Sequence, residues 1–112
     1  PLGGEIEFGE LSRDALVREI REEIVAEITD LRFLGTVENL FTYNGEPHHE
    51  IVLVYDAAFV DSTLYDSPAI AGREDAIDED FIAVWKRLNE FVPGQPPLYP
   101  DGLLALLRNI QA

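Results

Sequence analysis

The first regular pattern of apolar and polar positions covers residues 13–24. Its apolar members stand four residues apart or adjoin that series: Leu16, Val17, Ile20 and Ile24. On a helix they form one stripe, so we expect a helix that lies with this side against a core. Ser12 precedes the stretch, and its hydroxyl can accept from the backbone N–H groups of the first turn, which predicts an N-cap there.

The middle of the chain has the pattern of two extended segments joined by a turn. Residues 31–37 read as a strand, and residues 38–43 continue as extended chain. Asn44-Gly45 is a strong turn signal, although Glu46-Pro47 after it favours a connection longer than a two-residue hairpin. Residues 49–59 are apolar on both sides of their alternation, which predicts a strand covered on both faces.

The rest of the chain alternates between polar and apolar segments. Residues 61–80 are acidic and small, with a proline and a glycine, and we expect a long loop, of a length typical of functional lids or disordered segments. Residues 81–85 predict a short strand, residues 86–91 a turn or two of helix, and residues 103–110, rich in leucine at helical spacing, a last helix. The order of elements therefore predicts an α/β fold.

Composition narrows the class of protein. A chain of 112 residues is one small domain with a modest core. No apolar run is long enough to cross a bilayer, no signal peptide is evident and cysteine is absent, so we expect a cytoplasmic protein. The net charge of −14 argues against nucleic acid and against an anionic membrane as partners, because both would be repelled.

Three acids share the polar side of the first predicted helix. Glu19, Glu22 and Glu23 stand at i, i+3 and i+4, which places their like charges side by side. A hard divalent cation such as Mg²⁺ would relieve their repulsion, since it prefers carboxylate oxygens. The competing interpretation is a solvated acidic face on which Arg18 and Arg21 serve as local ion-pair partners.

The spacing over residues 3–26 resembles the Nudix box, in which a Gly is followed after five residues by Glu, and after seven more by Arg-Glu-aliphatic-any-Glu-Glu-any-Gly-aliphatic. The residues in register are Gly4, Glu10, Arg18, Glu19, Ile20, Glu22, Glu23 and Ala26. Val25 replaces the final Gly, which in the family lets the chain leave the helix. Because a β-branched residue tolerates positive φ poorly, we expect a different helix exit here, with no ligand lost.

The resemblance implies a site and a reaction. In the family the box binds Mg²⁺ or Mn²⁺ and cleaves a diphosphate linked to another group, so the chain is expected to be a pyrophosphohydrolase with a small-molecule nucleotide substrate. Glu19, Glu22 and Glu23 become metal ligands, with the backbone carbonyl of Gly3 as a further one. Either Glu22 or Glu23 would also activate water.

The resemblance also assigns supporting residues. Gly4 belongs to the glycine turn, and Glu10 and Arg18 become a structural pair that orients the loop against the helix. The family often draws another metal-binding acid from the region of residues 61–80, where Glu74 and Glu79 are candidates. His48 and His49 could contact phosphate, although a turn residue with a hydrogen bond is the preferred interpretation.

The resemblance further implies the architecture: a Nudix-type α/β/α sandwich with a mixed sheet, as a single domain over residues 1–112 that lacks the usual N-terminal strands. A homodimer is possible in this family. The alternative function is a catalytically inactive module that binds a nucleotide or a protein, and a third possibility is an acidic domain with an accidental match. The residues that read the substrate, and hence its identity among ADP-ribose, sugar nucleotides and nucleoside triphosphates, are unknown.

Overall fold

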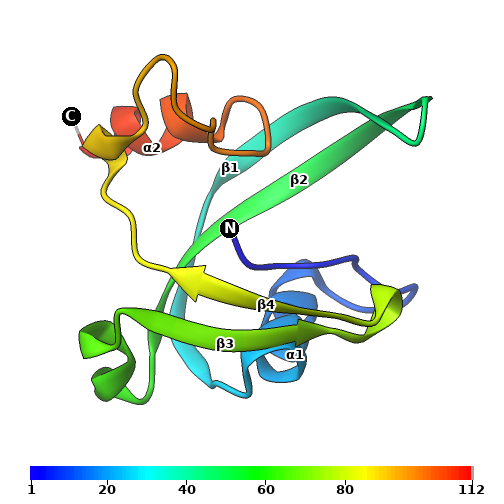
Figure 1. The fold of residues 1–112 in the computed structure, drawn as a ribbon. Helices are drawn as coiled ribbons and strands as arrows, with labels where there is room; N and C mark the ends of the chain where they lie inside the picture. The colour runs from blue at the N-terminus through cyan, green and yellow to red at the C-terminus, as the bar shows by residue number, and fades with distance from the viewer. Residues whose placement is uncertain (112) are drawn as a thin grey trace. The chain divides into compact units, whose positions relative to one another are not determined.

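The computed structural model describes residues 1–111 as an alternation of helices and antiparallel strands (Figure 1). The elements are α1 Ser12–Ile24, β1 Ile28–Tyr43, β2 Glu46–Phe59, η1 Ser62–Asp66, β3 Ala69–Glu74, η2 Asp75–Ile77, β4 Glu79–Val84, η3 Leu88–Glu90 and α2 Leu103–Gln111. The expected α/β class is confirmed. Where one mixed sheet was expected, the described strands pair only with their neighbours in sequence, β1 with β2 and β3 with β4, because short turns join them.

The described residues group into two compact units. Residues 2–32 and 56–85 form one, here called the α1 unit, and residues 33–55 and 86–111, with Pro1, form the other, the α2 unit. Strands β1 and β2 run through both. No helix within residues 1–111 combines the length and apolar character needed to cross a bilayer.

The core of the α1 unit lies under the apolar stripe of the first helix. Ile20 and Ile24 are buried there, as the spacing predicted, together with Ala26 after the helix. The partly buried side chains packed against them come from every part of the unit: Leu2, Leu16, Ile28, Phe59, Leu64, Ile70 and Phe81. This packing fixes the side of α1 that faces inward, so the acids of its polar flank are held at a defined edge.

The ends of α1 differ from the prediction. The helix begins at Ser12, and Leu11, with extended φ and ψ of −74° and 148°, holds the N-cap position without a side-chain hydrogen bond. The N-cap predicted at Ser12 is therefore wrong by one residue. At the other end Val25 is left-handed (φ 54°), and its N–H donates to the Arg21 carbonyl at 3.1 Å. The expected change of exit is wrong, because Val25 takes the conformation that Gly would adopt.

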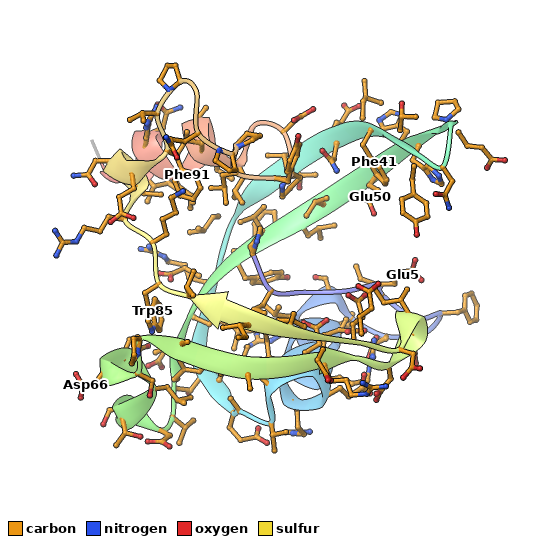
Figure 2. All side chains as sticks on the ribbon, in the orientation of Figure 1. Glu5, Phe41, Glu50, Asp66, Trp85 and Phe91 are labelled. Carbon is orange, nitrogen blue, oxygen red and sulfur yellow. The ribbon has the colours of Figure 1, made fainter. Side chains whose placement is uncertain are left out.

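Residues 61–80 are not a loop, and the prediction of one is wrong. Strands β3 and β4 pair antiparallel from Ala69 opposite Val84 to Glu74 opposite Glu79. Gly72 faces Phe81, whose ring occupies the space of a missing side chain. At the end of β4, Trp85 lies by the η1 segment that holds Asp66 (Figure 2), and its indole N–H donates to the Leu64 carbonyl at 3.2 Å.

The β1–β2 hairpin is tighter and more exposed than expected. Asn44 and Gly45 both have positive φ (51° and 79°), and β2 begins directly after them, so the longer connection predicted from Glu46-Pro47 is wrong. Side chains on β2 such as Ile51 are largely exposed, at 68%. The strand is thus not covered on both faces over this part of its length.

In the α2 unit, Asn39 on β1 joins three segments. It is 8% exposed, donates to a Glu50 carboxylate oxygen at 3.2 Å and accepts from the Asp101 backbone N–H at 3.0 Å. Figure 2 shows Glu50 on β2 near Phe41 on the neighbouring strand. Leu103, at the start of α2, is buried. These contacts tie the last helix to the hairpin strands.

Candidate functional site

The acids of interest lie on the polar flank of α1, inside the α1 unit. Glu23 is the most enclosed of them, since it is only 8% exposed. Burial, together with the neighbouring carboxyl groups of Glu19 and Glu74, raises the pKa of Glu23 to about 7, while a hydrogen bond from the Gly3 backbone N–H opposes this rise. Glu23 is therefore half protonated near neutral pH.

Glu19 and Glu23 are in direct contact through a side-chain hydrogen bond. Two carboxyl groups can share such a bond only when one of them holds a proton. The carboxyl of Glu19 also lies against the backbone of Gly4, where a Cβ atom would collide with it. The glycine turn and the helix thus approach each other at the acids.

Arg18 connects the turn to the same acids. Its Nε and Nη2 donate to the two Glu10 carboxylate oxygens at 2.9 and 3.0 Å, and Nη2 also donates to the Glu5 carbonyl at 3.0 Å (Figure 2 labels Glu5). The bond with Arg18 is the largest cause that lowers the pKa of Glu10. A bidentate bond of this kind fixes the relative orientation of the two side chains and is stronger than a single hydrogen bond.

The three predicted ligands are not equivalent. Glu22 is more than half exposed, and its carboxylate accepts from Arg18 Nη1 at 3.2 Å, while Glu19 accepts from the same nitrogen at 2.9 Å. Glu23 instead faces the Gly3 N–H. Within residues 1–111 no three acidic, His or Cys side chains converge closely enough to enclose an ion. Arg18 Nη1 instead contacts two of the three acids, Glu19 and Glu22.

The other predicted candidates fall in different places. Glu74 ends β3, and its charge helps to raise the pKa of Glu23. Glu79 lies opposite Glu74, at the start of β4. His48 stacks on Phe41 with ring centroids 5.0 Å apart, and His49 lies 2.8 Å from Glu38, all within the α2 unit. The role of the Glu5 carbonyl escaped sequence reasoning, since any residue has a carbonyl; its position between Gly4 and Glu10 is the only signal.

The chemistry of the donor set fits a hard divalent cation. Glu19, Glu23 and Glu74 present only carboxylate oxygens, the ligands that Mg²⁺ and Mn²⁺ prefer. Burial, together with the neighbouring carboxyl groups of Glu19 and Glu74, raises the pKa of Glu23, so its negative charge is disfavoured at this point. A cation at this point would take the role that a proton now has between Glu19 and Glu23.

Comparison with known proteins gives one match. The family model described as NUDIX domain matches residues 1–103. No curated protein and no solved structure matched. The matched range includes the glycine turn, α1 and both hairpins.

Proposed function

The chain belongs to the Nudix family, and from this premise we propose that it is a metal-dependent pyrophosphohydrolase whose centre is built from Glu19, Glu22 and Glu23. Hydrolases of this family act on nucleoside diphosphates linked to another moiety and generally use divalent metals such as Mg²⁺. The observation that supports the proposal is the contact of the buried Glu23 carboxyl with the partly buried Glu19 carboxyl beside the glycine turn.

Each residue of the site has a role in this proposal. Glu19, Glu22 and Glu23, with the backbone carbonyl of Gly3, would hold Mg²⁺ or Mn²⁺, and Glu74 is the supporting acid from β3. When bound, the metal supplies positive charge for the diphosphate oxygens. Gly4 leaves room for the Glu19 carboxyl, and the Glu10–Arg18 pair holds the turn against α1.

Glu22 and Glu23 are the two candidates for water activation, and Glu23 is the stronger. In its carboxylate form it accepts a proton from water while the water oxygen bonds to phosphorus and the bond from phosphorus to the bridging oxygen breaks. A general base works best with a pKa near the working pH, and burial raises the pKa of Glu23 to about 7. Glu22 lacks that enclosure.

A panel of nucleoside diphosphate-linked compounds, assayed with Mg²⁺ and with Mn²⁺, tests the proposal. We expect metal-dependent release of a nucleoside monophosphate from at least one member, and its loss in Glu23→Gln. Turnover that persists in Glu23→Gln or with a chelator present would refute the assignment.

One observation favours a second function, a Nudix module that binds a nucleotide without cleaving it. Arg18 satisfies both Glu19 and Glu22, as it would in a site that holds no metal. Isothermal titration with an ADP-linked ligand separates the two functions. A binding module would hold the ligand with no dependence on Mg²⁺ and release no AMP over hours.

A further inference from the structure

The guanidinium group of Arg18 has a partner for each of its five N–H bonds. Its Nε–Nη2 edge is directed at the turn, where it binds the Glu10 carboxylate and the Glu5 carbonyl at 2.9 to 3.0 Å. Its Nη1 is directed at the helix acids and donates to Glu19 at 2.9 Å and Glu22 at 3.2 Å. One side chain therefore serves two sets of acceptors through separate nitrogens.

The two edges of the Arg18 guanidinium group differ in whether the acids they bind are proposed metal ligands. The Glu10 carboxylate is not among the proposed ligands, whereas Glu19 and Glu22 both are. Among residues 1–111, no ion pair joins Glu23 or Glu74 to a cationic side chain. Arg18 Nη1 is thus the positive group that the carboxylate cluster contacts, and it contacts two of the proposed ligands.

We propose that Arg18 Nη1 is an internal counter-ion that occupies Glu19 and Glu22 and is displaced when a divalent cation binds them. The inference rests on the proposed metal site. The Nε–Nη2 edge stays on Glu10 during the exchange, so the turn keeps its place while the ligands are released. Arg18 is then a positioning residue whose Nη1 holds Glu19 and Glu22 until the metal binds them.

Proton loss cannot release these acids from Arg18. A guanidinium remains protonated at any pH at which a protein is folded, and its bond with Glu10 raises the pKa of Arg18 further. The exchange must therefore be a movement of Nη1 driven by the cation. Each charge-assisted bond that is broken subtracts from metal affinity.

Metal titration of three variants without substrate tests the competition. Arg18→Gln removes the counter-ion. Arg21→Gln is the control, because it removes the same charge from the same helix, and the ion pair that Arg21 makes within residues 1–111 is with Glu27. Glu10→Gln weakens the anchoring at the turn and leaves the Nη1 contacts. We expect Arg18→Gln to bind Mn²⁺ about tenfold more tightly than Arg21→Gln, and Glu10→Gln to bind no more tightly than wild type. Equal or weaker binding by Arg18→Gln than by Arg21→Gln would overturn the inference, because a purely structural arginine predicts that sign.

A measurement on the wild-type chain decides the matter even if Arg18→Gln does not fold. In protein labelled with ¹⁵N-arginine, Mg²⁺ should shift the Arg18 Nη1 signal and speed its exchange with water, while the Nε signal stays. If Mg²⁺ binds at the Glu23 carboxyl while the Arg18 Nη1 signal is unchanged, the inference about Arg18 is overturned but the metal site is not. Absence of Mg²⁺ binding in both wild type and Arg18→Gln would overturn the metal site itself, and this inference with it.

Discussion

The Glu19 carboxyl group fills the space into which a Cβ atom on Gly4 would project. Gly4 does not have a positive φ, so its conformation is open to other residues. The glycine is needed here for room, because any side chain at this position would push Glu19 off the turn. The i, i+4 spacing on α1 places Glu19 beside Glu23, and the glycine turn lies against the Glu19 carboxyl at Gly4.

Gly4→Ala should therefore damage metal binding more than folding. The added methyl group displaces the Glu19 carboxyl, and a displaced ligand or support typically costs 10- to 100-fold in metal affinity, about the loss we expect for Mn²⁺. Isothermal titration measures it. In Gly4→Ala combined with Glu19→Asp, the shorter acid leaves space for the methyl group and should recover part of the affinity. A single variant Gly4→Ala that binds Mn²⁺ like wild type would contradict the steric argument.

Glu23→Gln should separate catalysis from stability. The amide oxygen can still accept from the Gly3 N–H, and its NH₂ group can donate to Glu19, so the buried position remains satisfied. We expect turnover with Mg²⁺ to fall by about 10²-fold or more, while the melting temperature without metal at pH 8 rises. Glu46→Gln, which removes one exposed charge from the hairpin, is the matched control and should change neither. A lower melting temperature in Glu23→Gln would mean that its carboxylate stabilises the fold.

The contribution of Glu23 to stability should depend on pH in a defined direction. Its pKa rises from 4.5 to about 7 on folding, so between these values the unfolded chain loses a proton that the folded chain keeps. The contribution is fully present below pH 4.5, and it is lost as pH rises through 7. The difference in unfolding free energy between wild type and Glu23→Gln, measured in urea with a chelator, should shift by about 1–3 kcal/mol over this window. Saturating Mg²⁺ at pH 8 should abolish the lower stability of wild type relative to Glu23→Gln. A difference between the two proteins that does not change with pH would count against the burial argument.

The parts of the fold that could be predicted depend on local pattern. The stripe through Ile20 and Ile24, the last helix and the Asn44-Gly45 turn are each specified by adjacent residues. The β3–β4 hairpin was missed because its acidic composition resembles a loop. In the structure Arg73 contacts three aspartates, Asp75, Asp78 and Asp80, so local ion pairs offset charge that composition alone counts as repulsion.

In the candidate site, only the relations fixed by helix spacing or by the register of the box could be predicted. The spacing of Glu19 and Glu23 places them on one flank, and the box register pairs Glu10 with Arg18. That Glu74 lies beside Glu23 depends on the packing of β3 against α1, which no local pattern carries. The bonds of Arg18 to two sets of acids likewise depend on its side-chain conformation. The exposed position of Glu22, on Arg18 Nη1, could therefore not be predicted either.

Asn39→Ala should weaken the α2 unit. The substitution leaves the partly buried Asp101 N–H without its acceptor, at a cost of about 1–3 kcal/mol. Hydrogen exchange of the amides of β1, β2 and α2 measures the loss. Asn89→Ala, an exposed asparagine in η3, is the control and should stay within about 0.5 kcal/mol of wild type. Asn39→Asp keeps an acceptor for Asp101 but places a second carboxylate against Glu50, so at neutral pH it should recover only part of the lost stability.

Val25→Gly should stabilise the chain. Val25 holds a left-handed conformation at φ 54°, which costs a non-glycine residue about 1–2 kcal/mol and a β-branched one more, and its side chain is 88% exposed, so little packing is lost. Against this gain stands the greater freedom of glycine in the unfolded chain, about 0.5–1 kcal/mol. The net expectation is a gain of about 1 kcal/mol in urea unfolding. Val60→Gly replaces another exposed valine, 64% exposed and without positive φ, and should lose stability instead. Equal effects of the two substitutions would show that the left-handed exit of α1 is not strained.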